Sequence, residues 1–208
     1  MSTVAPQPKV LVAYYSATGN VATLAHSLAE GARTVGADVR VMRVAETAPA
    51  EAIAANPKWQ SWVDNVTDPL VSLEDLAWCD GLAIGSPTRF GGPASQMKAF
   101  LDTTGGLWFA DALSSKVCTA FTSASTLHGG LESTILAINN HFYHWGSLII
   151  PLGYTTQHVR KVSGNPYGAS FVSRSGAAAD DVSQQSAHDQ GARLATVTRE
   201  LLIGRQYA

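Results

Sequence analysis

Hydroxyl-bearing residues and glycine follow an apolar segment near the start of this chain, and together they could bind a phosphate. The turn is Ser16-Ala17-Thr18-Gly19-Asn20-Val21, directly after residues 10–15. A turn between a strand and a helix offers backbone N–H groups and the positive end of the helix to an anion. The turn has no lysine and no Gly-x-Gly-x-x-Gly spacing, which argues against an ATP-binding loop and a dinucleotide. It therefore predicts a site for a single terminal phosphate, such as that of flavin mononucleotide (FMN).

Two later turns share this character. Pro87-Thr88-Arg89-Phe90 follows the apolar residues 81–85, and Ser123-Ala124-Ser125-Thr126 follows residues 117–121. The carboxyl ends of parallel strands meet at one edge of a sheet, so we expect the three turns to form one crevice, with the phosphate at the first turn and a flat polar group between the other two. The candidate cofactor-binding residues from these turns are Ser16, Ala17, Thr18, Gly19, Asn20, Val21, Pro87, Thr88, Arg89, Phe90, Ser123, Ala124, Ser125 and Thr126.

The segments that must position these turns alternate between two patterns. Apolar, β-branched runs predict buried strands, and apolar residues at helical spacing lie between them. This alternation is typical of a mostly parallel sheet with helices on both faces. Strands are expected near 9–15, 38–44, 81–85, 117–121 and 147–150, with a short one at 170–172. Helices are expected near 20–35, 73–78 and 132–142, and another follows the second turn with Met97, Phe100 and Leu101 on one face. A last helix with Ser183 as its cap buries Leu194, Val197 and Leu201.

Composition predicts one domain over residues 9–204 after a disordered tail over 1–8. Residues 47–70 contain three prolines, two tryptophans and no sustained period, which fits either an interface loop or a surface loop pinned by its tryptophans. The net charge of -2 argues against nucleic-acid binding. Residues 1–8 lack the basic and apolar regions typical of a signal peptide, no apolar run reaches the length of a membrane span, and Cys79 and Cys118 are isolated. We therefore expect a cytoplasmic protein with reduced thiols and no membrane insertion.

Several other residues, taken one by one, give only weak evidence of a metal site or a catalytic role. His128, His141 and Glu132 lack the spacing of metal ligands, so we expect no metal. Taken alone, a histidine such as His144 near a helix end is more often a cap than a catalytic group. Trp108 alone is more often part of a core or an interface.

Several motifs, in their order and spacing, resemble one known family. Over residues 9–202 the chain resembles the flavodoxin-like superfamily, and within it the tetrameric WrbA-type NAD(P)H:quinone oxidoreductases. The motifs that carry the resemblance are Tyr14-Tyr15-Ser16, Pro87-Thr88-Arg89-Phe90-Gly91, Gln96-Met97-Lys98-Ala99-Phe100-Leu101-Asp102, Thr104-Gly105-Gly106-Leu107-Trp108 and Pro166-Tyr167-Gly168-Ala169. The resemblance implies an α/β fold, a flavodoxin-like doubly wound five-stranded parallel sheet in the order 2-1-3-4-5.

The resemblance also implies an oxidoreductase with bound FMN, which passes two electrons from NAD(P)H to a quinone and yields the hydroquinone. It implies a homotetramer in which the site is complete only after assembly. Arg89 would line the flavin ring and Trp108 would form the stacking wall on the substrate side. His144 would reach the cofactor and the quinone from a neighbouring subunit, and Tyr154 would lie near that pocket.

Two departures from the family pattern leave alternatives open. The turn from Ser123 to Glu132 carries Leu127 and His128 where the family has glycines, and Thr18-Gly19-Asn20 replaces a Tyr-Gly-His common in the family. The first departure would suit an interaction or regulatory protein with weakened FMN affinity. A flavodoxin-like electron carrier is the other alternative, disfavoured by the nearly balanced charge of the chain.

Overall fold

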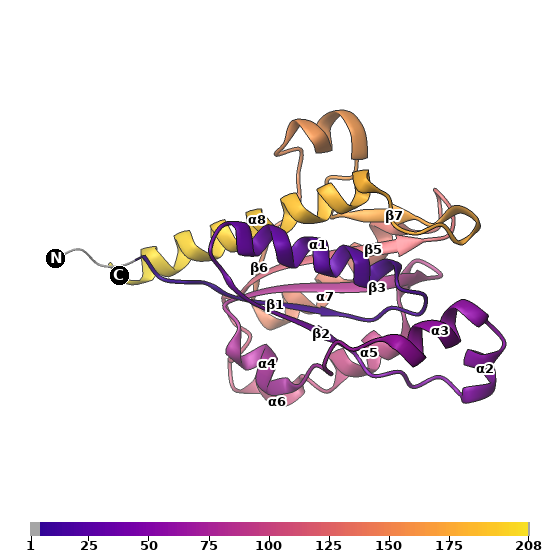
Figure 1. Ribbon diagram of the computed structural model, residues 1–208. Helices are drawn as coiled ribbons and strands as arrows, with labels where there is room; N and C mark the ends of the chain where they lie inside the picture. Colours follow the sequence, from indigo (N-terminus) through magenta and orange to yellow (C-terminus); the bar gives the residue numbers. More distant parts are fainter. Residues whose placement is uncertain (1–4, 208) are drawn as a thin grey trace.

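The computed structural model describes residues 5–207 and contains a mainly parallel sheet between two layers of helices (Figure 1). The five principal strands are β1 (Lys9–Tyr14), β2 (Asp38–Arg43), β3 (Gly81–Arg89), β5 (Val117–Ala124) and β6 (Leu148–Ile149). Their order is β2-β1-β3-β5-β6, with Val12 paired to Val41 on one side and to Ala83 on the other. Numbered along the chain, these strands have the order 2-1-3-4-5, which confirms the prediction.

Two further short strands extend this sheet. β4 (Gly92–Pro93) pairs antiparallel with the end of β3, and β7 (Ser170–Val172) pairs parallel with the end of β5. The strand predicted over 147–150 is shorter than expected, because β6 accompanies only the start of β5 at Val117 and Cys118. The edge beside β5 is therefore shared by β6 and β7, and the short strand predicted at 170–172 is confirmed.

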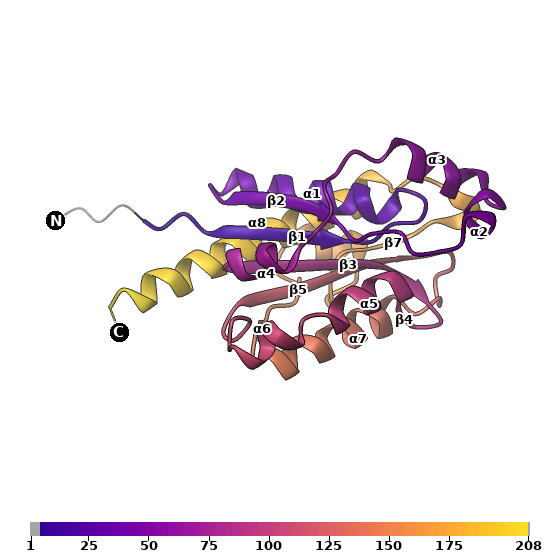
Figure 2. The ribbon, with the colours of Figure 1, turned by 90° about the horizontal axis from the view of Figure 1, so that it is seen from below.

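Strand β1 is apolar on both faces because each face lies under helices. Successive side chains of a strand point to opposite faces. Val10, Val12 and Tyr14 pack with α1 (Asn20–Thr34) and α8 (Asp181–Arg205), whereas the intervening Leu11 and Ala13 pack with the opposite layer. That layer consists of α4 (Leu73–Trp78), α5 (Ser95–Asp102), α6 (Gly105–Phe109) and α7 (Leu131–Trp145) (Figure 2).

Helices α1 and α8 lie side by side in close contact (Figure 1). A Cβ added to Gly191 would lie 1.8 Å from the carbonyl oxygen of Leu28, and one added to Gly31 would lie 1.9 Å from that of His188. Neither distance leaves room for a side chain, so the two glycines set the approach of the helices.

The structure corrects three expectations about helices. Ser183 does not cap the last helix: α8 begins earlier, and the Asp180 carboxylate accepts from Ser183 N at 2.8 Å, because aspartate is as good a cap as serine. Helix α7 continues past Phe142 to Trp145 and ends at Gly146, whose φ is 70°. Residues 47–70 are not a simple loop.

That segment contains two short helices, α2 (Ala50–Ala54) and α3 (Pro57–Asn65). The Asn56 side chain caps α3 by accepting from Lys58 N and Trp59 N, and Pro57 stands at the first position of the helix. Asn-Pro is a helix-start signal that the lack of a longer period obscured. The interface role expected for 47–70 stays a prediction.

The predicted disordered tail spans 1–8, of which residues 1–4 lie outside the described part of the chain, while 5–8 have no regular secondary structure. Among residues 5–207, no helix combines the length and the apolar character needed to cross a membrane.

Candidate functional site

A cavity of about 270 Å³ lies where β1, β3 and β5 end, and all three sequence-predicted turns line it. Gly19, Phe90 and Thr126 belong to the turns but are not among its lining residues. Asn56, Trp59 and Ser173 also line it and were not predicted. The predicted residues that line the cavity are Ser16, Ala17, Thr18, Asn20, Val21, Pro87, Thr88, Arg89, Ser123, Ala124 and Ser125.

The first turn has the donors that an anion requires. Gly19 is the residue before α1, and its φ is 92°. No side chain caps the start of the helix, and its first turn contains no acidic residue. The Ser16 hydroxyl accepts from Gly19 N at 3.0 Å, while the N–H groups of Thr18 and Asn20 have no partner within residues 5–207. These N–H groups at the positive end of a 15-residue helix fit a phosphate.

The second turn is fixed by hydroxyl contacts beneath the cavity. Thr88 Oγ1 donates to the carbonyl oxygen of Gly129 at 3.1 Å and accepts from Thr134 Oγ1 at 2.8 Å. Gly130, which precedes α7, has a φ of 94°, and a Cβ there would lie 2.8 Å from the Cα of Gly91. The end of β3 and the start of α7 are thereby held against each other.

Arg89 lies on the wall of this cavity with an exposed side chain. Its Nη1 donates to the carbonyl oxygen of Thr88 at 3.0 Å, and it forms no salt bridge with a carboxylate in the described part of the chain. Its remaining donors are available to an acceptor in the cavity.

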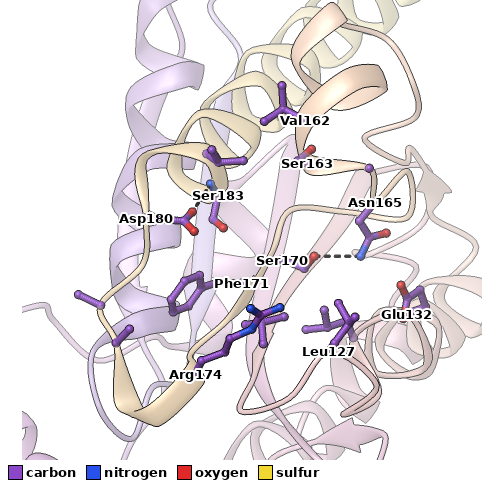
Figure 3. Close-up of a pocket in the computed structure, with 16 residues that line it drawn as sticks. Leu127, Glu132, Val162, Ser163, Asn165, Ser170, Phe171, Arg174, Asp180 and Ser183 are labelled. Atoms are coloured by element: carbon purple, nitrogen blue, oxygen red, sulfur yellow. Dashed lines mark hydrogen bonds between the residues drawn. The ribbon is translucent and has the colours of Figure 1, made fainter.

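The bulky residues of the third turn do not enter this cavity. Ser123, Ala124 and Ser125 line it, whereas Leu127 lies on a separate cavity of about 680 Å³ together with Phe171 and Arg174 (Figure 3). The larger volume is not the better candidate, because none of the residues of the first two turns lines it. The departure at Leu127 leaves the smaller cavity open.

Three predicted residues lie away from the cavity of their own chain. Trp108 is an exposed residue of α6, and His144 is an exposed residue in the last turn of α7. Figures 1 and 2 show α6 and α3 at opposite ends of the sheet. Tyr154 is half-exposed and its hydroxyl donates to the carbonyl oxygen of Gly164 at 3.3 Å. A single chain therefore does not bring these three side chains to the cavity.

The missed residue Trp59 occupies a defined position in the cavity wall. It lies on α3, and its indole N–H donates to the carboxylate of Glu46 at 2.8 Å. Tyr15, directly before the first turn, donates to the same oxygen at 2.8 Å. Burial and the Glu46 hydrogen bond raise the pKa of Tyr15, so this phenol stays protonated at neutral pH. The only signal for Trp59 in the sequence is a tryptophan next to Asn56-Pro57, which indicates a helix but not a site.

Known proteins are similar to this chain over most of its length. Residues 9–159 match the family described as NADPH-dependent FMN reductase. An NAD(P)H dehydrogenase (quinone) from Deinococcus radiodurans is 39% identical over 195 residues, which cover 93% of this chain and 97% of that protein. A protein of the same name from Azorhizobium caulinodans is 47% identical over 182 residues, covering 85% and 86%.

Solved structures agree with the arrangement of the sheet. A flavodoxin, WrbA-like protein from Agrobacterium tumefaciens has a TM-score of 0.68 at 23% identity, over 93% of this chain and 99% of that one. A flavodoxin from the domain Archaea has a TM-score of 0.61 at 18% identity, over 92% and 99%. The flavodoxin-like fold predicted from the sequence is confirmed.

Proposed function

This chain belongs to the NADPH-dependent FMN reductase family, and we propose that it is a flavoprotein oxidoreductase that reduces quinones to hydroquinones with FMN and NAD(P)H. Relatives named NAD(P)H dehydrogenase (quinone) align over nearly the whole chain. The observation that carries the proposal is the cavity at the carboxyl edge of the sheet, which three separate turns line. A monophosphate cofactor with a flat ring matches this combination of features.

Bound FMN would supply the redox chemistry, by accepting a hydride from NAD(P)H and passing two electrons on. The protein binds and orients it. The N–H groups of Thr18 and Asn20 and the Ser16 hydroxyl suit the phosphate, with the N-terminus of α1 compensating its charge. The second and third turns, 87–90 and 123–126, are the proposed walls of the ring. The Arg89 guanidinium favours negative charge that develops in the cavity.

We propose that the site is completed by assembly into a homotetramer. The cavity volume of about 270 Å³ lies below the range of about 300–1,000 Å³ usual for small-molecule sites. Trp108 belongs to α6 and His144 to the last turn of α7, and neither lines the cavity of its own chain, so in this proposal they reach a cavity from another copy. There Trp108 would stack over the substrate, His144 would donate to the quinone oxygen and contact the cofactor, and Tyr154 would border the pocket. Exposed Phe90 and Phe109 support self-association.

We further propose a single domain over 9–204 and a cytoplasmic location. The two cysteines, Cys79 and Cys118, are free and buried, as in proteins of reducing compartments. Burial raises the pKa of both thiols, so neither is suited to act as a nucleophile in the reaction.

The experiment combines binding with turnover. Apoprotein titrated with FMN should quench flavin fluorescence, and the loaded protein should oxidise NADH or NADPH rapidly when benzoquinone is added. A rate no higher than that of free FMN would contradict the enzymatic proposal. Anaerobic titration with dithionite gives a second criterion: an enzyme of this type passes to the two-electron reduced state, whereas abundant stable semiquinone would favour an electron carrier.

A further inference from the structure

The carboxylate of Glu46 is a hub of hydrogen bonds directly behind the proposed FMN cavity. One oxygen, Oε2, accepts from the Tyr15 hydroxyl and from Trp59 Nε1, each at 2.8 Å. The other, Oε1, accepts from Gln96 Nε2 at 2.7 Å and from two backbone N–H groups, those of Thr47 and Ala48, at 2.9 Å each. One side chain therefore joins the end of β1, the segment after β2, helix α3 and helix α5.

All five partners are arranged to donate to the carboxylate, which suits its ionised form. An ionised carboxylate accepts hydrogen bonds from all five partners, whereas a protonated one carries an O–H that only the Tyr15 oxygen among them could accept. Burial alone would raise the pKa of Glu46, but hydrogen bonds from Ala48 N, Tyr15, Gln96 and Trp59 hold that pKa below its usual range. No Lys, Arg or His forms a salt bridge with Glu46 in the described part of the chain. The hydrogen-bond network around Glu46 therefore suits a negatively charged acceptor.

Two of the partners of Glu46 lead directly to the cavity. Trp59 is itself part of the cavity wall, and its ring packs against the core layer that contains Tyr15 and Ala17. Tyr15 immediately precedes Ser16, the first residue of the phosphate turn. Glu46 is not among the lining residues, so any effect on a ligand must pass through these neighbours.

We propose that Trp59 contacts the bound cofactor and that Glu46 is the positioning residue that fixes the Trp59 indole and the start of the phosphate turn. This inference rests on the proposed FMN binding. In a glutamine of the same shape, the amide NH2 fits better at the position of Oε2, because the Tyr15 hydroxyl can accept there, whereas the two backbone N–H groups at Oε1 can only donate. The Trp59 indole N–H would then face a donor and lose the partner that fixes its orientation. A wall that is not pre-organised binds its ligand more weakly.

The test uses two substitutions in the full-length chain and a matched control. Glu46→Gln keeps the shape and removes the charge, and Trp59→Phe keeps an aromatic ring and removes the N–H. Glu51→Gln makes the same change as the first variant at an exposed residue of α2, whose carboxylate accepts no hydrogen bond within residues 5–207. FMN dissociation constants come from quenching of flavin fluorescence, and melting temperatures report global stability.

We expect Glu46→Gln to weaken FMN binding about tenfold, because the hydrogen bonds it loses involve a charged acceptor. Trp59→Phe should weaken binding about threefold or more, and Glu51→Gln should bind as the wild type does. The loss from Glu46→Gln should be several-fold smaller when Trp59 is already Phe, because the two residues share one hydrogen bond. The fluorescence of Trp59 in the apoprotein is the difference between the emission of the wild type and that of Trp59→Phe. In Glu46→Gln this tryptophan emission should move to longer wavelength.

A Glu46→Gln variant with a lower melting temperature but wild-type FMN affinity would overturn the proposal and leave Glu46 a purely structural residue. If the losses of FMN affinity from Glu46→Gln and Trp59→Phe simply add in the double variant, Glu46 does not act through Trp59. If Glu46→Gln does not fold, Trp59→Phe alone decides: unchanged FMN affinity rejects the contact with the cofactor. A wild-type chain that fails to bind FMN would instead overturn the proposed function.

Discussion

Gly19 is the residue at which one added methyl group tests the phosphate turn most directly. Its φ of 92° lies in the region that costs an L-residue roughly 1–2 kcal/mol. The new Cβ would also lie 3.3 Å from Cε3 of Trp62, a close contact. We therefore expect Gly19→Ala to lower the free energy of unfolding of the FMN-loaded protein by about 1–2 kcal/mol, and its melting temperature by roughly 2–8 °C for a chain of this length.

The same substitution should weaken FMN binding. The apoprotein can relieve the strain by rotating the first turn of α1, but binding must restore the orientation of its N–H groups. If the full 1–2 kcal/mol is repaid on binding, the dissociation constant rises by a factor of about 5–30. Titration of each apoprotein with FMN, followed by flavin fluorescence, measures this factor.

Gly36→Ala is the matched control, because Gly36 has a φ of 82° and a Cβ there would lie 3.4 Å from Arg199 Nη2. Gly36 follows the other end of α1, away from the cavity. We expect it to lose a similar amount of stability and to keep the FMN affinity of the wild type. Equal FMN affinities for Gly19→Ala and the wild type would refute the assignment of the phosphate to this turn.

Three further predictions follow from particular contacts. Gly191→Ala should destabilise the chain by roughly 3 kcal/mol, the upper end for overpacking, because its Cβ would meet the Leu28 carbonyl oxygen; an unchanged denaturation midpoint would contradict the packing of α1 on α8. Burial alone would raise the pKa of Asp75, but hydrogen bonds, including one from Arg40, hold it below its usual range. The contribution of Asp75 to the free energy of unfolding is therefore complete above the unfolded pKa of about 3.9 and is lost as pH falls through the lower folded pKa. The stability advantage of the wild type over Asp75→Asn should shrink between pH 6 and pH 3. A constant difference over that range would refute this role of Asp75. Arg89→Gln should lower the midpoint potential of bound FMN by about 30 mV, equivalent to 1.4 kcal/mol for two electrons, in spectroelectrochemical titration; an unchanged potential would remove Arg89 from the site.

Local patterns were sufficient to predict most of the sheet. The run from Val10 to Tyr15 has apolar residues at every position, which is characteristic of a strand covered on both faces, and β1 is covered by helices on both sides. The hydroxyl-rich turns were predictable for the same reason, because each directly follows such a run. The cap of α8 was not, because Asp180 and Ser183 are both good caps and only the backbone path distinguishes them.

The contacts of Glu46 depend on the tertiary structure. Glu46 and Gln96 are 50 residues apart in the chain, and no periodic pattern relates them. Trp59 lies among prolines, where sequence spacing gives no direction to its side chain. The sequence by itself determined the alternation of strands and helices and the chemistry of the three turns, because these depend on neighbouring residues. Only the tertiary structure decided that Trp59 joins them and that Trp108 and His144 do not within one chain, because those positions depend on how the layers pack.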